Sequence, residues 1–163
     1  MCHNTIIKPA SNDLRIQQAK KLFLEYAESL NFNLCFQYFE KELACLPGEY
    51  AKPSGRLLLL YHDNNPVGCV ALRKENDKIS EMKRLYVMPE YRGKGFGRKL
   101  AIEVIRQAKE IGYERMKLDT VPSMKEAIKL YQEIGFDEVS AYRYNPVEGA
   151  IYMELNLLEW SGE

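Results

Sequence analysis

The residues best suited to chemistry lie in a glycine-rich stretch, residues 86–100, where an apolar run leads into an amphipathic pattern with helical spacing. Three glycines here, Gly93, Gly95 and Gly97, let the backbone approach a ligand closely. A turn of this kind at a helix start exposes backbone N–H groups, and the helix dipole favours negative charge there. Four cations fall within eight residues of the same stretch: Arg92, Lys94, Arg98 and Lys99. The stretch is therefore predicted to bind an anion.

The spacing of the glycines excludes two common phosphate-binding motifs. A nucleoside-triphosphate loop needs GxxxxGK followed by Ser or Thr, and residues 93–100 contain no such pattern. A dinucleotide-binding fingerprint needs GxGxxG, but Arg98 stands three residues after Gly95. The pattern present is Arg92-x-x-Gly95-x-Gly97. A strand-to-helix connection that binds nothing is the alternative, but three glycines among cations cost more conformational entropy than such a connection needs.

Length and composition predict one soluble domain, residues 1–163. The chain is 46% hydrophobic and 28% charged, which is typical of globular domains. Its 23 basic and 23 acidic residues leave no net positive field for nucleic acid or anionic lipid. The longest strongly apolar run, residues 57–61, is far shorter than a membrane helix, and the amino terminus lacks the apolar segment of a secretory signal. We therefore expect a cytoplasmic protein that binds neither nucleic acid nor membrane.

Cysteine and histidine usage argues against metal chemistry. The four cysteines contain no CxxC pair, and the two histidines, His3 and His62, are far apart in the sequence. We expect no metal site, and a histidine-based triad would depend on His62 alone. The residues therefore favour chemistry that needs neither a metal nor a histidine.

Hydrophobic periodicity predicts a mixed α/β fold. Strands are expected at residues 5–8, 56–62, 67–73, 79–87, 116–120, 138–144 and 150–157. Helices are expected at residues 13–30, 36–46 and 96–111, and between Ser123 and Gly135, with Ser123 and Glu126 as a capping box. The order β-α-α-β-β-β-α-β-α-β-β implies a mixed sheet with helices covering it.

The pattern Arg92-x-x-Gly95-x-Gly97 resembles the turn with which the GNAT family of N-acetyltransferases binds the pyrophosphate of coenzyme A. A second segment, residues 127–136 (AIKLYQEIGF), resembles the family's A-x-x-L-Y-x-x-x-G-F helix end at a fitting distance. Residues 81–87 look like the family's central strand, and the similarity extends over residues 5–157. The resemblance implies a GNAT-like fold, with helices on both faces of a splayed sheet, and acetyl-CoA as the acyl donor.

The resemblance also implies a set of cofactor-binding residues. The backbone N–H groups of Leu85, Tyr86 and Val87 would bind the pantetheine arm and polarise the thioester carbonyl. The turn that would hold the pyrophosphate comprises Arg92, Gly93, Lys94, Gly95, Phe96, Gly97 and Arg98. Many relatives carry an asparagine seven residues before the helix tyrosine, where this chain has Met124. Met124 cannot donate the asparagine's hydrogen bond to the pantetheine amides, so Thr120 and Ser123 are expected to replace it. Ala127, which begins the second motif, completes the predicted cofactor site.

Acetyl transfer to an amine requires the loss of a proton from the amine and tolerance of a departing thiolate. A lysine-type amine titrates near pH 10, so a base or a proton path to solvent is needed, but no covalent enzyme intermediate is. Tyr131 matches the family tyrosine beside the coenzyme sulfur, where a phenol can protonate the thiolate; as an alternative it is a core residue.

Glu81 is the candidate general base. It stands eleven residues before Arg92, where some family members carry a basic carboxylate. Strict alternation would place it on one strand face with Lys83, Leu85 and Val87, a mixed set that suggests a β-bulge. The alternative is a solvated or ion-paired strand residue.

The acceptor side is encoded less clearly. In a fold of this type the first two helices, the loop at residues 46–55 and residues 142–146 would line the acceptor groove. Tyr142 is expected there, with Arg84 or Arg143 as the partner of a carboxylate on a small-molecule amine. A non-catalytic acyl-CoA sensor and a protein lysine or amino-terminal acetyltransferase are the alternatives. The sequence leaves open the identity of the acceptor, the length of the acyl group and whether the chain forms a homodimer.

Overall fold

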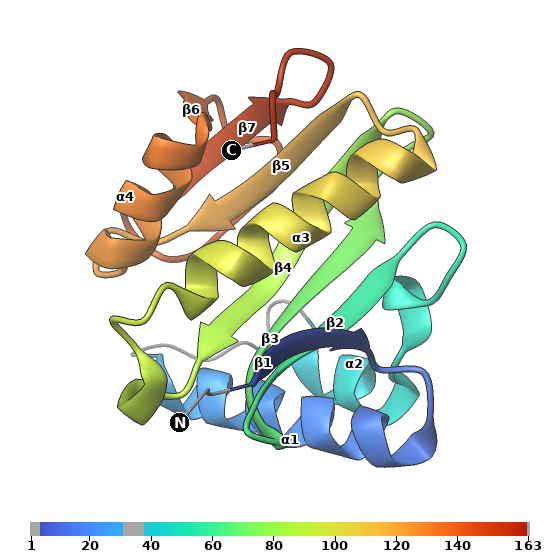
Figure 1. The fold of residues 1–163 in the computed structure, drawn as a ribbon. Helices are drawn as coiled ribbons and strands as arrows, with labels where there is room; N and C mark the ends of the chain where they lie inside the picture. Colours follow the sequence, from blue (N-terminus) through green and yellow to red (C-terminus); the bar gives the residue numbers. More distant parts are fainter. Residues whose placement is uncertain (1–3, 31–37, 163) are drawn as a thin grey trace.

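The computed structural model describes residues 4–30 and 38–162, and in these the helices and strands follow the predicted order (Figure 1). They are β1 (Thr5–Pro9), α1 (Asp13–Ser29), α2 (Phe39–Cys45), β2 (Arg56–His62), β3 (Asn65–Lys74), β4 (Ile79–Val87), α3 (Phe96–Ile111), β5 (Arg115–Thr120), α4 (Lys125–Ile134), β6 (Asp137–Val139) and β7 (Ile151–Asn156). Short 3-10 turns, η2 (Gly48–Tyr50) and η3 (Pro89–Tyr91), precede β2 and α3. The predicted mixed α/β fold is confirmed.

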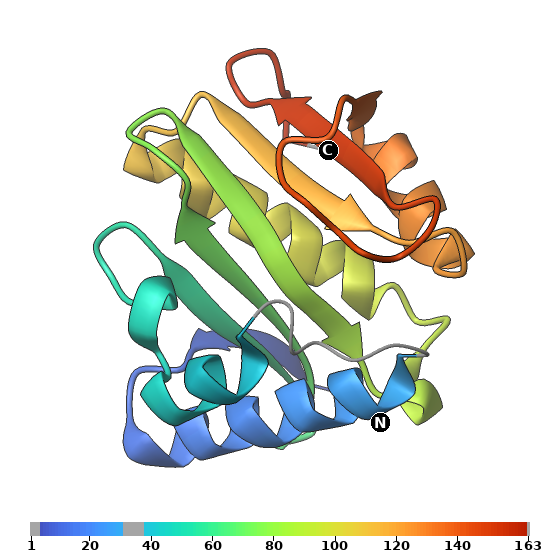
Figure 2. The ribbon, with the colours of Figure 1, turned by 180° about the vertical axis from the view of Figure 1, so that it is seen from behind.

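The strands form one mixed sheet in the order β1-β2-β3-β4-β5-β7-β6. β4 and β5 are parallel, and every other neighbouring pair is antiparallel. Helices α3 and α4 cover one face, and α1 and α2 cover the other (Figures 1 and 2). Each face has its own core: Leu100 and Val104 of α3 pack on one, and Phe23 of α1 and Phe39 of α2 pack on the other. Helices therefore lie on both faces, as expected.

Local sequence signals account for several element ends. The Asn12 side chain caps α1 by accepting a hydrogen bond from the Arg15 backbone N–H at 2.9 Å. Gly112 ends α3 in the left-handed conformation, with φ of 114°. Asp63 and Asn64 both have positive φ, which is what a two-residue hairpin turn between β2 and β3 requires.

Two irregularities in β4 shape the centre of the sheet. Cys69 pairs with Tyr86 and Ala71 pairs with Lys83, so two β4 residues lie opposite the single β3 residue between Cys69 and Ala71. This bulge holds Arg84 at φ of 60°. On the other side, pairing between β4 and β5 covers Ile79 to Glu81 and no later β4 residue that the structure describes. β4 and β5 therefore separate toward their carboxyl ends. The predicted β-bulge is present on the β3 side of β4.

The bulge explains the mixed strand face noted in the sequence. Leu85 packs against the core under α3, and Tyr86 belongs to the core under α1 and α2. Glu81 and Lys83 therefore lie on the α1 and α2 face, while Leu85 and Val87 lie on the opposite face.

Three predictions about local structure were wrong. The strand expected at residues 138–144 ends at Val139, and residues 140–150 form a loop across the face that α1 and α2 cover (Figure 2). The capping box is absent, because Met124 is the N-cap of α4 and no side chain caps this end. The helix expected at residues 36–46 is shorter and begins at Phe39; residues 36 and 37 lie outside the described part of the chain.

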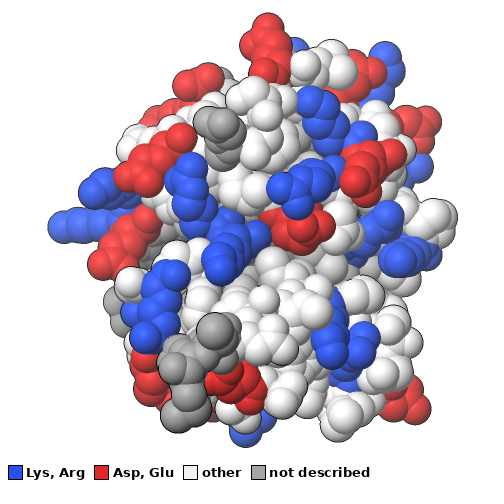
Figure 3. Space-filling model, in the orientation of Figure 1, with Lys and Arg blue, Asp and Glu red and all other residues white. Residues whose placement is uncertain are grey.

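The described residues contain no helix that is both long and apolar enough to cross a membrane. On the face shown in Figure 3, Lys and Arg side chains are interspersed with Asp and Glu side chains.

Candidate active site

A groove of about 670 Å³ lies where β4, the glycine-rich turn and the starts of α3 and α4 meet. The predicted cofactor residues that line it are Leu85, Tyr86, Val87, Arg92, Gly93, Gly95, Phe96, Gly97, Arg98, Ser123 and Ala127. Lys94 and Thr120 are not among its lining residues. Helix α1 adds Tyr26, Ser29 and Leu30, which sequence reasoning did not assign to this groove.

The glycine-rich turn has the backbone that an anion site needs. Gly93 and Gly95 have φ of 79° and 81°, a conformation that strains other residues, and no atom outside the chain neighbours lies within 4 Å of a Cβ built on either. Gly95 is the N-cap of α3, and no side chain caps this end of the helix. Arg92 stabilises the turn, because its Nε donates to the Val87 carbonyl at 2.8 Å and its guanidinium lies over the Tyr86 ring.

A smaller hollow of about 40 Å³ occupies the gap between β4 and β5. Tyr131 of α4 and its N-cap Met124 line it together with Thr120 at the end of β5, and Lys83, Arg84 and Leu85 line it from β4. Tyr131 is buried against Phe136, and burial raises its pKa, so its phenol stays protonated at neutral pH. Thr120 donates to the Met124 sulfur at 3.7 Å. Tyr131 therefore lines the gap between β4 and β5 and is also part of the hydrophobic core.

Glu81 is fully buried and surrounded by donors. One carboxylate oxygen pairs with the Arg73 Nε at 2.7 Å and with an Arg143 Nη at 3.0 Å. The other oxygen accepts a hydrogen bond from the Tyr142 hydroxyl at 2.7 Å. Burial alone would raise the pKa of this carboxyl, but Lys83, Arg73 and Arg143 together lower it below its ordinary value. A carboxylate held in this way is a weak base, so the geometry does not favour the predicted catalytic role.

A charged pocket of about 510 Å³ lies on the α2 side of β4. It is lined by Lys41, Glu42 and Cys45 of α2, the segment from Pro47 to Tyr50, Tyr38, Arg73 of β3, Lys83 of β4, and Arg143 and Tyr144 of the loop before β7. Sequence reasoning expected the loop at residues 46–55 and the segment 142–146 here, but it missed Arg73 and Lys83.

The three predicted acceptor residues lie in different places. Arg143 lines the charged pocket, and its guanidinium also pairs with Glu75 at 3.0 Å. Tyr142 lies behind it, with its hydroxyl on Glu81 and its ring beside the Arg143 and Lys117 cations. Arg84 does not line the pocket; its buried guanidinium makes two 2.8 Å hydrogen bonds to Glu42. Arg84 therefore stabilises the contact between β4 and α2.

Shared lining residues connect the three hollows. Tyr26, Leu85 and Met124 line both the groove and the gap between the strands, and Lys83 lines both the gap and the charged pocket. The gap therefore adjoins both larger cavities.

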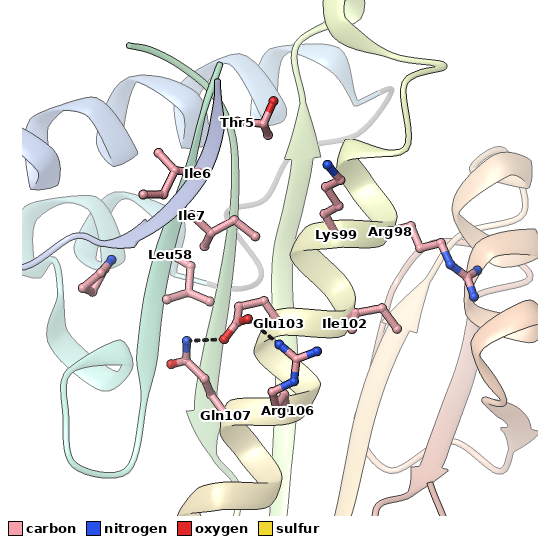
Figure 4. Close-up of a pocket in the computed structure, with 11 residues that line it drawn as sticks. Thr5, Ile6, Ile7, Leu58, Arg98, Lys99, Ile102, Glu103, Arg106 and Gln107 are labelled. Carbon is pink, nitrogen blue, oxygen red and sulfur yellow. Dashed lines mark hydrogen bonds and ion pairs between the residues drawn. The ribbon is translucent and has the colours of Figure 1, made fainter. Parts of the chain in front are cut away.

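A further cavity of about 580 Å³ lies between β1 and α3, away from the gap (Figure 4). Its polar side chains contact each other: Glu103 accepts hydrogen bonds from Arg106 and Gln107, both at 2.9 Å. Of the predicted site residues, Arg98 alone lines it. Over residues 4–30 and 38–162, no three His, Cys, Asp or Glu side chains form a group that could hold a metal ion.

Comparison with known proteins agrees with this arrangement. The Acetyltransferase (GNAT) family matches residues 17–136. An uncharacterised N-acetyltransferase of Schizosaccharomyces pombe is 36% identical over 85% of this chain and 86% of its own length. N-acetylaspartate synthetase of Rattus norvegicus is 30% identical over 90% of this chain and 46% of its own length. A GNAT family acetyltransferase structure from Elizabethkingia anophelis with acetyl-CoA bound has a TM-score of 0.65 at 22% identity, covering 94% of this chain and 98% of that one.

The chain therefore belongs to the GNAT family of acetyltransferases, and the resemblance seen in the sequence is confirmed.

The Glu81 network predicts a specific pH dependence of stability. We expect Glu81→Gln to lower the free energy of unfolding by about 3 kcal/mol or more at neutral pH, because it leaves two arginines without their buried partner. The pKa of Glu81 is lowered in the folded protein, so its contribution is present above the ordinary value of 4.5 and is lost as pH falls through the folded-state pKa.

Urea unfolding at neutral pH and at successively lower pH measures this effect. The difference between wild type and variant should narrow in acid, and a difference that stays constant with pH would contradict the assignment. Glu138→Gln, at an exposed position, is the control and should change stability by no more than about 0.5 kcal/mol.

Proposed function

We propose that this protein transfers the acetyl group of acetyl-CoA to the primary amine of a small molecule that carries a carboxylate. The observation that carries the proposal is the gap between β4 and β5, which shares lining residues with the groove and with the charged pocket. Direct attack of the amine on the thioester needs no covalent enzyme intermediate, because a thiolate is a good leaving group.

The donor side supports acetyl-CoA as the ligand of the groove. The positive-φ glycines leave open space beside the start of α3, where N–H groups and the helix dipole favour a pyrophosphate. Beyond Glu81, no β5 partner is present for the described part of β4, so the backbone of Leu85 and Val87 borders the groove as an unpaired strand would. An amide-containing pantetheine arm can pair with such an edge. The acetyltransferase structure from Elizabethkingia anophelis has acetyl-CoA bound, which supports this choice of ligand.

Tyr131 is the proposed proton donor to the departing sulfur. It lines the gap from α4, and its phenol carries a proton at neutral pH that a departing thiolate can accept. Tyr26 lies close enough to influence the pKa of Tyr131, so two phenols flank the same small space. Leu85 places the strand backbone on the opposite side of the gap.

The acceptor side supports a small amine with a carboxylate. Arg73, Arg143 and Lys83 line a pocket of about 510 Å³, and arginine binds carboxylates well. N-acetylaspartate synthetase, a relative, is named for an amino-acid product, which favours the same acceptor class. A protein acceptor is less favoured, because the chain has no net charge to attract basic tails.

Thiol release from acetyl-CoA is the assay for this function. The panel comprises L-aspartate, L-glutamate, glycine and β-alanine, with spermidine as an amine that lacks a carboxylate. We expect release with at least one amino acid and little with spermidine. Binding of CoA in calorimetry without release by any amine would refute catalysis and leave the acyl-CoA sensor; release by spermidine alone would refute the carboxylate.

The glycine-rich turn can be tested with two matched glycines of α3. Gly95→Ala should weaken CoA binding by about tenfold or more, because a Cβ would project into the space proposed for the pyrophosphate and the positive φ would be strained. Gly112→Ala carries the same strain at the other end of the helix, far from the groove, and should leave CoA affinity unchanged. Calorimetry on both variants measures the difference, and equal affinities would place the pyrophosphate elsewhere.

Removal of one hydroxyl tests the proton donor. Tyr131→Phe should lower kcat about ten- to a thousandfold with little change in CoA affinity, as expected for a lost general acid. Tyr113→Phe removes another hydroxyl, which donates to the Ser54 carbonyl outside the site, and should leave kcat unchanged. An unchanged kcat in Tyr131→Phe would make Tyr131 a core residue only.

A further inference from the structure

Lys83 is a buried lysine at the junction of the two substrate sites. Its residue is 7% exposed, and it lines both the gap beside Tyr131 and the charged pocket on the α2 side. The bulge that follows at Arg84 keeps the Lys83 side chain on the face where an acceptor amine would enter. Among the residues that the structure describes, Lys83 alone lines both of these hollows. In the proposed reaction, Lys83 therefore lies where the acceptor amine must lose a proton.

The charges around Lys83 come from several elements. They are Arg73 on β3, Glu81 and Arg84 on β4, Asp119 on β5, Glu42 on α2, Tyr26 on α1 and Arg143 in the loop before β7. Glu42 is bonded to Arg84, and Glu81 is bonded to Arg73 and Arg143. The third carboxylate, Asp119, accepts a hydrogen bond from the Asn145 side-chain amide at 3.1 Å.

Burial is the main reason why Lys83 loses its proton easily. Desolvation, with the Arg84 and Arg73 cations, outweighs Glu81 and Asp119 and lowers the pKa of Lys83 to about 8. About a tenth of the side chains are then neutral at neutral pH, and about half at pH 8. Lysines tuned in this way by burial are suited to act as general bases. Glu81, in contrast, has both oxygens engaged by donors.

We propose that the side-chain amine of Lys83 is the base that accepts the proton of the acceptor's ammonium group. The inference depends on the acetyl transfer proposed above and adds a catalytic residue to it. It assigns Glu81 a positioning role, since Glu81 holds Arg73 and Arg143 in the wall of the pocket and lies beside Lys83.

The step balances as follows. The acceptor ammonium gives one proton to neutral Lys83, and the nitrogen lone pair forms a C–N bond with the thioester carbon. The C–S bond breaks, and the second nitrogen proton passes to the sulfur through Tyr131, which leaves an amide and a free thiol. Lys83 then releases its proton to water through the charged pocket, so each turnover yields one proton.

The first measurement is the pH dependence of kcat for the wild-type protein, with saturating acetyl-CoA and the amino acid that gives the fastest thiol release. We expect kcat to rise with pH and to level off above an apparent pKa near 8, because the neutral form of Lys83 is the active one. A profile that is flat through this range would overturn the proposal even if no variant folds.

Two substitutions separate a proton acceptor from a mere positive charge. Lys83→Met and Lys83→Arg should both lower kcat at neutral pH about a hundredfold, since neither side chain accepts a proton there. CoA affinity by calorimetry should stay the same in both variants, which also shows that they fold. If Lys83→Arg keeps the wild-type kcat, or if Lys83→Met changes the KM of the amino acid alone, the lysine supplies only charge and the proposal is wrong.

Lys78→Met is the matched control on the same segment. The Lys78 side chain is 73% exposed, pairs with Glu114 and lies outside all three hollows, so kcat should not change. Wild-type protein that binds CoA but acetylates no amine would refute the proposed function itself. Wild-type turnover with unchanged Lys83 variants would refute this inference alone.

Discussion

The separation of β4 from β5 is the constraint on which the site depends. Their parallel pairing covers Ile79 to Glu81, and the bulge at Arg84 then turns the rest of β4 away from a regular ladder. Without that separation the sheet would be continuous and its two faces would be isolated from each other by paired backbone. With it, Tyr131 and Lys83 reach one small space from opposite faces of the sheet. The bulge is stabilised on both sides, because the Cys69 thiol donates to the Arg84 carbonyl and Glu42 binds the Arg84 guanidinium.

A charge network centred on buried Glu81 holds one wall of the charged pocket in place. Glu81 connects β3, β4 and the loop before β7, through Arg73, Tyr142 and Arg143. Removing the Glu81 carboxylate would leave Arg73 and Arg143 with only the more exposed Glu49 and Glu75 as partners, and losing a buried partner costs far more than an exposed ion pair contributes. The loop wall of the pocket therefore depends on a carboxylate in the centre of the sheet. The stability of the protein and the geometry of the charged pocket are therefore coupled through Glu81.

Local signals made the glycine-rich turn predictable from the sequence, whereas the charged pocket depends on contacts between distant segments. The glycine-rich turn and the cap at Gly112 follow from short-range spacing, so the groove could be located in advance. The alternating pattern of residues 138–144 also reads as a strand, but Tyr142 and Arg143 contact Glu81 some sixty residues away and hold this segment as a loop. Lys83 looked like an ordinary strand residue, since its burial depends on that loop and on α2.

The groove and the charged pocket are separate cavities, and this affects the order in which substrates can bind. Within the described residues, the groove at the glycine-rich turn and the charged pocket share no lining residue. Under the function proposed above, neither substrate needs to leave before the other arrives, and both can be bound together in a ternary complex. That layout suits a sequential kinetic scheme, in which the nucleotide portion of the donor stays anchored while the acylated product departs by the entrance through which its precursor came.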